Sequence, residues 1–428
     1  MKVFLSTVGC RLNQSEIEQI AAQLRSLGHV LVDSPQTADW VIVNTCTVTA
    51  RAASDSRQVI RQAGRQGNSR IVVTGCWATL EPQAAASLPG VTKVVSNWEK
   101  DDLVRSLFGI AENGVLAVSK MARVPIPGPR RRTRAFIKAQ DGCDNHCTFC
   151  VTRIARGVSR SRPAEKVIRD IQAAAEGGSK EAVLTGVQLG SWGRDFDPPQ
   201  RLHDLIERVL EETEIPRLRL SSLEAWDLDE SFFALWENAR LCRHLHLPLQ
   251  SGSDDVLRRM GRKTTTEQFA RLVQTARSVI PSVSITTDVI VGFPGETDKD
   301  FEQSLAFVRQ LGFSGGHVFS YSLRPQTPAA QLTDQVPFSI RKVRSAQMRA
   351  AFSELSIQYR RGLLGSTCVV LWESGHRMEN SRWRMRGLTD HYVPVFADMG
   401  ENLLNKMTAV QLIALCSQGV LGEVIPAE

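Results

Sequence analysis

Apolar strands alternate with amphipathic helices through the first 110 residues of the chain. The short apolar runs KVFLSTVGC (2–10), DWVIVNTC (39–46) and RIVVTGC (70–76) predict buried strands. Between Ser15 and Leu27, apolar residues recur at intervals of three and four, which is typical of an amphipathic helix. Strands and helices that alternate in this way predict a doubly wound parallel sheet.

Six further strand candidates follow, and helical patterns separate them. They lie at residues 134–139, 181–187, 217–223, 243–248, 284–291 and 316–321. This α/β alternation predicts an incomplete TIM-type barrel, (β/α)6, whose functional residues would lie at the carboxyl ends of the strands.

The C-terminal pattern differs from the rest of the chain. A long helix is expected at 339–361, and after Ser366 the runs TCVVLW, WRMRGL and HYVPVFA predict a small antiparallel β-barrel. The expected organisation is an N-terminal domain at 1–112, a linker rich in Pro and Gly at 113–130, a central barrel at 131–361 and a C-terminal barrel at 362–428.

Composition narrows the class of protein. The chain has 428 residues, of which 42% are hydrophobic and 23% charged, as in soluble globular proteins with several cores. No apolar run could span a bilayer, and the N-terminus lacks a signal-peptide pattern, so we expect a cytoplasmic protein without membrane contact. Nine cysteines in a reducing compartment favour ligand chemistry over disulfides. The net charge of +7 is compatible with a polyanionic partner.

The run GCDNHCTFC follows the first barrel strand and contains Cys143, Cys147 and Cys150. Three thiolates in one loop can hold a four-iron cluster, which prefers four thiolates, so one iron would stay open to another ligand. The alternative is a zinc site with His146 as fourth ligand. It is less favoured because structural zinc commonly uses two spaced pairs of ligands and no second CxxC is present.

A second set of cysteines closes the three N-terminal strands, namely Cys10, Cys46 and Cys76. Ligands of open α/β sheets gather at the carboxyl ends of the strands, and neighbouring strands lie about 4.8 Å apart. Gly9 and Gly75 precede two of these cysteines. We therefore favour a site over the alternative, which is three small buried packing residues.

Small and polar residues also end the barrel strands, where cofactor contacts are expected. Strand-end turn chemistry is the alternative for each of them. The candidates are Thr185, Gly186, Ser222, Glu224, Gln250, Ser251 and, in the run GFPGE, Gly292, Phe293 and Pro294.

Two groups of arginines suggest contacts to a phosphate backbone, although basic runs are usually solvated surface. In the C-terminal region, arginines alternate with Trp383 and Met385, which places them on one face of a strand. The RNA-binding candidates are Arg153, Arg156, Arg160 and Arg162 after the cysteine loop, and Arg382, Arg384 and Arg386.

Seven motifs in order resemble the radical S-adenosylmethionine methylthiotransferases over essentially the whole chain. They are TVGCRLNQSE, VNTCTVT, VTGCWA, GCDNHCTFC, HLPLQSGSD, DVIVGFPGE and YSLRPQTPA. The aromatic Phe149 before the last cysteine of the loop belongs to this pattern and is a further cofactor-binding candidate. The C-terminal region resembles the TRAM module, a small RNA-binding β-barrel, with His391 where relatives often carry asparagine.

The resemblance implies two [4Fe–4S] clusters and S-adenosylmethionine. One cluster, held by Cys143, Cys147 and Cys150, would bind S-adenosylmethionine at its open iron and generate a 5′-deoxyadenosyl radical. The other, held by Cys10, Cys46 and Cys76, would be auxiliary and carry the sulfur to be transferred. The implied partners are tRNA, a reducing electron donor and a sulfur source.

The branch of the family decides the substrate. TVGCRLNQSE and AFIKAQDGCD are most similar to enzymes that place CH3–S on carbon 2 of N6-threonylcarbamoyladenosine at position 37 of tRNA. Alternatives are isopentenyladenosine at the same position, an aspartate of a ribosomal protein, and a non-catalytic iron–sulfur RNA-binding protein. Gln326 stands where the family usually has glycine, which leaves the local turn open.

Overall fold

The structure is a computed structural model that describes residues 1–65, 70–109 and 133–426. Its contacts divide the chain into two compact units. The first comprises Met1–Asn145, Cys150–Gly178 and Leu184–Gln200, and the second comprises His146–Phe149, Ser179–Val183 and Arg201–Glu428. The predicted linker at 113–130 lies outside the described residues.

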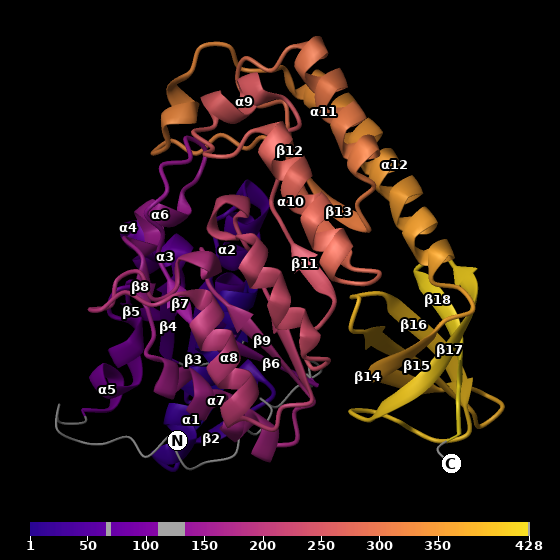
Figure 1. Cartoon of the computed structure of the whole chain (residues 1–428). Coiled ribbons are helices and arrows are strands. Elements are labelled where there is room, and N and C mark those ends of the chain that lie inside the picture. Colours follow the sequence, from indigo (N-terminus) through magenta and orange to yellow (C-terminus); the bar gives the residue numbers. More distant parts are fainter. Residues whose placement is uncertain (66–69, 110–132, 427–428) are drawn as a thin grey trace. The chain divides into compact units, whose positions relative to one another are not determined.

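The N-terminal part of the first unit contains a parallel five-stranded sheet in the order β2-β1-β3-β4-β5 (Figure 1). This confirms the predicted doubly wound sheet. The strands are β1 (Lys2–Thr7), β2 (Val30–Val32), β3 (Trp40–Thr45), β4 (Arg70–Gly75) and β5 (Val91–Val94). The helices are α1 (Arg11–Ser26), α2 (Ala50–Arg65), α3 (Cys76–Leu80), α4 (Pro82–Ala86) and α5 (Leu103–Phe108).

Alternation along the strands builds a core on each face of this sheet. On one face, Ile42 and Val72 pack with residues of α1 such as Ile20. On the other, Val43 and Val73 pack with residues that include Ile60 of α2. Successive strand residues point to opposite faces, so each strand must be apolar throughout when helices cover both faces.

The six strands predicted for the central region are present within a few residues of their expected bounds. Their order is β10-β9-β6 in one sheet and β11-β12-β13 in another. They are β6 (Arg134–Lys138), β9 (Glu181–Thr185), β10 (Arg217–Leu220), β11 (His244–His246), β12 (Ser284–Val291) and β13 (Gly315–Ser320). Two short strands, β7 (Gln140–Asp141) and β8 (Arg160–Ser161), pair with each other. The helices are α6 (Thr152–Arg156), α7 (Ala164–Glu176), α8 (Leu202–Glu212), α9 (Asp254–Arg259), α10 (Thr266–Val279) and α11 (Asp298–Leu311).

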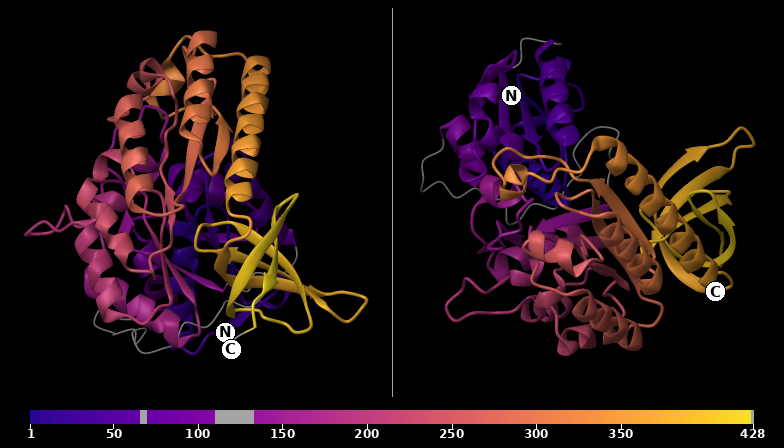
Figure 2. Two further views of the ribbon diagram at one scale, coloured as in Figure 1. Left: turned by 45° about the vertical axis from the view of Figure 1, so that its right-hand side comes forward. Right: turned by 90° about the horizontal axis from the view of Figure 1, so that it is seen from above.

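In the second unit, the long helix α12 (Phe338–Gly362) leads into a closed five-stranded barrel, which lies at its C-terminal end (Figure 2). The barrel order is β14-β15-β16-β18-β17. Its strands are β14 (Thr367–Arg377), β15 (Trp383–Thr389), β16 (Pro394–Met399), β17 (Met407–Cys416) and β18 (Gly419–Val424). None of the helices in the described ranges combines the length and the apolar character needed to cross a bilayer.

The barrel corrects one expectation, because it is not purely antiparallel. β16 and β18 pair in parallel, whereas the other four pairs are antiparallel. A closed ring with an odd number of strands must contain a parallel pair, since strand direction cannot alternate all the way round. Trp372 is fully buried in the barrel core, and its Nε1 donates to Oγ1 of Thr408 at 2.9 Å.

Trp372→Ala should lower the opening free energy of the barrel by about 3–5 kcal/mol, because it removes a fully buried indole and leaves a cavity. Native-state hydrogen exchange of the amides in β14 to β18 measures this free energy in the full chain. Trp383→Ala is the control, since Trp383 is only partly buried against the same core, and its effect should be smaller. Equal protection in the two variants would contradict the assignment of Trp372 to the core.

Candidate metal centres

Three cysteines lie at the carboxyl edge of the N-terminal sheet. Cys10 is the N-cap residue of α1 after β1, Cys46 directly follows β3, and Cys76 begins α3 after β4. β1 pairs with β3, and β3 pairs with β4. Residues far apart in sequence therefore meet at one edge, as the strand pattern predicts.

Two glycines make room for this cysteine edge. Gly9 has φ +102°, and a Cβ at this position would lie 2.5 Å from Sγ of Cys46. Gly75 has φ +98°, and its Cβ would lie 2.3 Å from the carbonyl oxygen of Thr45. Both positions require glycine for the backbone conformation and for space.

The thiols at this edge differ in exposure. Cys46 and Cys76 are buried, whereas Cys10 is exposed. Burial raises the pKa of the Cys46 thiol to about 11, and the nearby Cys10 and Cys76 also raise it. Because cysteine binds a metal as the thiolate, metal binding here must displace the thiol proton of Cys46. The chemistry of three converging thiols fits an iron–sulfur cluster with one open iron.

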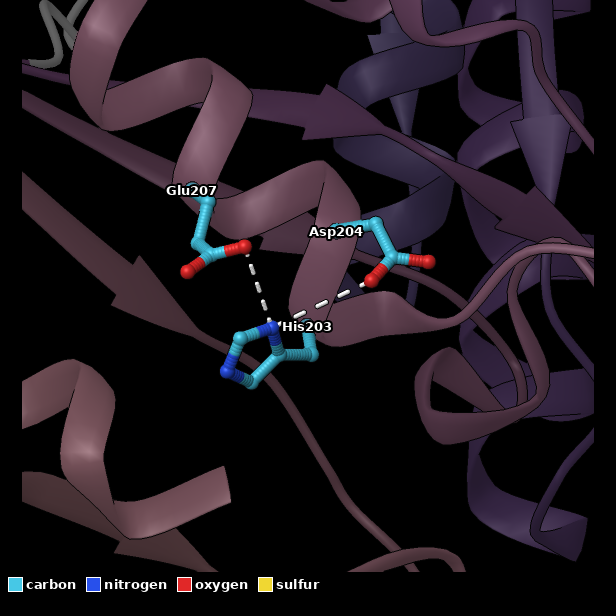
Figure 3. Close-up of side chains that lie close together, drawn as sticks. All are labelled: His203, Asp204 and Glu207. Carbon is cyan, nitrogen blue, oxygen red and sulfur yellow. Dashed lines mark ion pairs between the residues drawn. The ribbon is translucent and has the colours of Figure 1, made fainter. Parts of the chain in front are cut away.

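A compact group of metal-type donors on α8 provides a contrast. Figure 3 shows His203, whose Nδ1 lies 3.2 Å from Oε2 of Glu207 and 3.9 Å from Oδ1 of Asp204. Within the described part of the chain, His203, Asp204 and Glu207 are the one set of three such residues whose ligand atoms all lie within 4.8 Å of one another. These are surface contacts of one helix, and Asp204 also accepts the Arg201 amide. The thiols of the N-terminal edge are spread more widely, which fits ligands on separate irons better than a single zinc ion.

A buried ion network lies beside the cysteine edge, and we call it the Glu16 network. Its members are Glu16, Lys100, Lys138, Asp141 and Arg156, all at most 6% exposed. Arg156 Nη1 lies 2.8 Å from both Glu16 and Asp141, and Lys100 Nζ lies 2.7 Å from Glu16. Lys138 Nζ lies 2.8 Å from Asp141 and 3.6 Å from Glu16.

Arg156 corrects the prediction that it contacts RNA. Its side chain is 1% exposed, and its guanidinium is occupied by two carboxylates. Burial opposes ionisation of Glu16, but the charges of Arg156, Lys100 and Lys138 hold the pKa of Glu16 well below its usual range. No sequence signal revealed this role, because Glu16 is 140 positions away from Arg156.

Two of the three cysteines of the central loop accept hydrogen bonds that suit thiolate ligands. In the first unit, Sγ of Cys143 accepts from the Asn145 amide at 3.4 Å, and the Cys143 thiol donates to Oε1 of Gln188 at 3.3 Å. In the second unit, Sγ of Cys147 accepts from Nη1 of Arg262 at 3.8 Å. Cys150 belongs to the first unit and is half-buried. Donors at ligand sulfurs are typical of iron–sulfur sites, so the residues present fit a cluster.

Sequence reasoning missed Arg262, which is fixed on several sides. It forms a two-pronged ion pair with Glu224, with Nη1–Oε1 at 2.9 Å and Nη2–Oε2 at 2.5 Å. Nη2 also donates to the carbonyl of Pro248, and the guanidinium lies 4.5 Å from the Trp226 ring centre. Glu224, predicted to bind cofactor, is thus the anchor of this arginine. The motif search could not pair them, because they are 38 residues apart.

Several other cofactor candidates also make contacts within the protein, and their role towards the cofactor stays a prediction. Phe293 is fully buried and packs with Met260 and Tyr321. Thr185 Oγ1 donates to the Ile137 carbonyl at 3.1 Å, and Ser251 Oγ accepts from the Ser253 amide. Pro294 is also buried.

The run GFPGE forms a turn that leads into α11. Gly292 has φ +69°, and its amide donates to Oε1 of Glu296 at 2.8 Å. Glu296 also pairs with Arg344 at 2.6 Å. A Cβ at Gly292 would collide with the Arg341 side chain, so this glycine is required without any ligand.

The remaining candidates stay predictions. Phe149 is half-buried and lies edge-on to Phe293, with ring centres 6.5 Å apart. Ser222 is half-buried, and Gln250 holds φ +70° between two backbone hydrogen bonds to β12. A Cβ at Gly186 would lie 2.9 Å from Oε1 of Gln140. In the turn with Gln326, the Thr327 amide donates to the Arg324 carbonyl at 2.9 Å, so the turn closes without glycine.

Arg382, directly before β15, and Arg384 and Arg386 within it lie as their alternation predicts. Arg382, Arg384 and Arg386 are exposed, and Met385 between them is fully buried. Arg384 pairs with both carboxylate oxygens of Asp398 at 2.7 Å. Near the cysteine loop, Arg160 is exposed and Arg153 is half-buried, whereas Arg162 pairs with Asp170 at 2.8 Å. Basic side chains are thus concentrated on one face of β15.

The fold and the cysteine loop define a radical S-adenosylmethionine enzyme. The model of the Radical SAM superfamily matches residues 137–308, and that of the uncharacterized protein family UPF0004 matches residues 2–96. A solved radical S-adenosylmethionine methyltransferase, TsrM from Kitasatospora setae, has this fold with a TM-score of 0.58 at 17% identity, covering 77% of each chain.

Curated relatives narrow the family. The threonylcarbamoyladenosine tRNA methylthiotransferases MtaB of Bacillus subtilis and Thermotoga maritima are 36% and 38% identical to this chain. The matches cover 96% and 98% of this chain and 93% and 96% of the relatives. The tRNA-2-methylthio-N(6)-dimethylallyladenosine synthase of Caldicellulosiruptor saccharolyticus is 32% identical over 98% of this chain and 91% of its own. The chain therefore belongs to the radical S-adenosylmethionine tRNA methylthiotransferases.

Gly9→Ala should reduce the iron content of anaerobically reconstituted protein from about eight to about four per chain. The added Cβ would lie 2.5 Å from Sγ of Cys46 and displace that ligand. Iron and sulfide analysis measures the loss. Gly28→Ala is the matched control, because Gly28 also has a positive φ (+76°) but nothing lies within 4 Å of the added Cβ. Full iron content in Gly9→Ala would contradict the site at this edge.

Proposed function

We propose that this enzyme adds a CH3–S group to carbon 2 of N6-threonylcarbamoyladenosine at position 37 of tRNA. The observation that carries the proposal is the near full-length similarity to two relatives named for this substrate, at 36% and 38% identity. The relative named for dimethylallyladenosine is less similar, at 32% identity. The threonylcarbamoyl branch is therefore preferred.

The two sets of cysteines have different roles in the proposed reaction. Cys10, Cys46 and Cys76 would hold the auxiliary cluster, and Cys143, Cys147 and Cys150 would hold the cluster that binds S-adenosylmethionine. When bound, these groups supply one-electron reduction, radical hydrogen abstraction and the transferred sulfur. Arg262 supports one ligand directly: its N–H contact to Cys147 favours the thiolate form, and Glu224 holds the guanidinium in place.

The remaining parts of the chain have separate tasks in this proposal. Residues 1–112 form the auxiliary-cluster domain, 131–361 the radical core and 362–428 the RNA-binding barrel. The exposed arginine face of β15 supports the last assignment, because phosphates attract cationic side chains. The reaction also requires a reducing electron donor and a sulfur source, and we propose that it takes place in the cytoplasm, where tRNA is modified.

Deletion of the gene should abolish 2-methylthio-N6-threonylcarbamoyladenosine in bulk tRNA, while unmodified N6-threonylcarbamoyladenosine accumulates. Nucleoside mass analysis measures both species. Complementation with the unaltered gene should restore the product, and complementation with Cys147→Ala should not, since that variant lacks one cluster ligand. Unchanged 2-methylthio-N6-threonylcarbamoyladenosine together with loss of the dimethylallyl analogue would overturn the choice of substrate.

Replacing Arg382, Arg384 and Arg386 together with Gln should weaken tRNA binding. The slope of log K against log salt concentration should fall by about 2–3, because each lost phosphate contact removes about one counterion. Filter binding at several salt concentrations measures the slope. The control replaces Arg201, Arg271 and Arg309, which are exposed outside the barrel, and removes the same charge. Equal slopes for the two triple variants would argue against binding at the β15 face.

A further inference from the structure

The side chain of Asn13 connects the Glu16 network to the cysteine edge. Arg156 Nη2 donates to Oδ1 of Asn13 at 2.7 Å. The same Oδ1 lies 3.7 Å from Sγ of Cys10. Nδ2 of Asn13 donates to the carbonyls of Val8 and Thr45, at 2.8 and 2.9 Å. These two residues stand just before the Gly9–Cys10 pair and Cys46, so Arg156 orients the amide that joins two cysteine-bearing strand ends.

A second contact reaches the third cysteine. Nδ2 of Asn97 donates to the carbonyl of Ala155 at 2.8 Å and lies 3.6 Å from Sγ of Cys76. Ala155 is the neighbour of Arg156 on the short helix α6. The turn that carries Arg156 is therefore connected, through Asn13 and Asn97, to the three strand ends that carry the cysteines.

The network also includes residues on both sides of the central cysteine loop. Asp141 lies two positions before Cys143, and Arg156 lies six positions after Cys150. Arg156 joins the two flanks, with Nη1 at 2.8 Å from Oδ1 of Asp141. The backbone amide of Cys143 donates to the Gly157 carbonyl at 3.0 Å. Arg156 thus connects the cysteine edge with the segments on both sides of the central cysteine loop, within the same unit.

The charges of the network are unbalanced. Three buried cations, Arg156, Lys100 and Lys138, face two buried carboxylates, Glu16 and Asp141. Asp101 also approaches Lys138, at 3.7 Å, but its side chain is 80% exposed and its charge is screened. A net excess of one positive charge in a buried network is costly. Thiolate ligands at Cys10, Cys46 and Cys76 would supply the missing negative charge.

We propose that Arg156 is a positioning residue for the auxiliary cluster: held by Glu16 and Asp141, it fixes the cysteine edge through Asn13 and supplies the buried positive charge that sets the reduction potential of the cluster. The proposal rests on the proposed function for the presence of that cluster. A nearby cation stabilises the reduced, more negative form and so raises the reduction potential, and low-dielectric surroundings strengthen the effect. Net charge around a cluster is one of the factors that tune its potential.

The test isolates the auxiliary cluster in the full chain. Cys143, Cys147 and Cys150 are replaced together by Ala, the protein is reconstituted anaerobically, and the potential is read from a redox titration followed by electron paramagnetic resonance. Arg156→Met should shift the potential to more negative values, because it removes the cation. Arg156→Lys should recover most of the shift, since it keeps the charge. Glu16→Gln should shift it in the opposite direction, because it removes a negative charge and keeps the shape.

Opposite shifts distinguish an electrostatic role from simple loss of structure, which would move every variant the same way or release iron. Arg169→Met is the control, since Arg169 is an exposed arginine on α7 that donates to the Glu165 carbonyl. It should leave the potential unchanged. If Arg156→Met loses the cluster, the reduction potential of the Glu16→Gln variant alone tests the proposal. Full iron content with an unshifted potential in Glu16→Gln would overturn the proposal.

The failure of the proposed function gives a different result. If the protein without the central cysteines binds no iron, Cys10, Cys46 and Cys76 do not hold a cluster, and both proposals fall. If it holds about four irons but the potential does not respond to Glu16→Gln, only the role of Arg156 falls. An altered tRNA substrate affects neither measurement, because no tRNA is present in the titration.

Discussion

The burial of Arg156 between Glu16 and Asp141 is the constraint on which the first unit depends. A buried guanidinium is tolerated only when carboxylates and hydrogen-bond acceptors surround it. Glu16 comes from α1, Asp141 from the short strand before the cysteine loop, and Asn13 from the first turn of α1. Satisfying one charge therefore fixes the segments that present Cys10, Cys46 and Cys143. The ion network and the cysteine edge of the N-terminal sheet are parts of one arrangement.

The second unit repeats this design at Arg262. A buried arginine is again held by a carboxylate, here Glu224. Arg262 donates directly to a cysteine sulfur, that of Cys147, whereas Arg156 acts through Asn13. Arg156 and Arg262 both lie outside the cysteine motifs in the sequence and approach the cysteines only in the folded chain. Positive charge beside thiols favours their deprotonated form, which is the form that binds metal.

The C-terminal barrel is joined to the central strands of its unit by arginines that bind backbone. Arg219 donates to the carbonyls of Thr389 and Asp390 and pairs with Glu181 at 2.7 Å. Tyr392 stacks on His244 with ring centres 4.6 Å apart. Tyr392 thus makes an internal contact, while the arginine face of β15 is exposed.

The sequence by itself determined the secondary-structure elements and predicted the metal ligands. Period and composition located the parallel strands and the six central strands, because burial on both faces demands continuous apolar runs. The spacing of one set of cysteines, and the strand-end positions of the other, predicted two metal sites. Only the tertiary structure decided which polar groups serve those sites. Arg156 looked like an RNA contact, and Glu224 like a cofactor contact, because local sequence cannot show partners 140 and 38 residues away. The cost of leaving a charge buried and unpaired, which depends on the whole fold, explains why each of these residues has an oppositely charged partner.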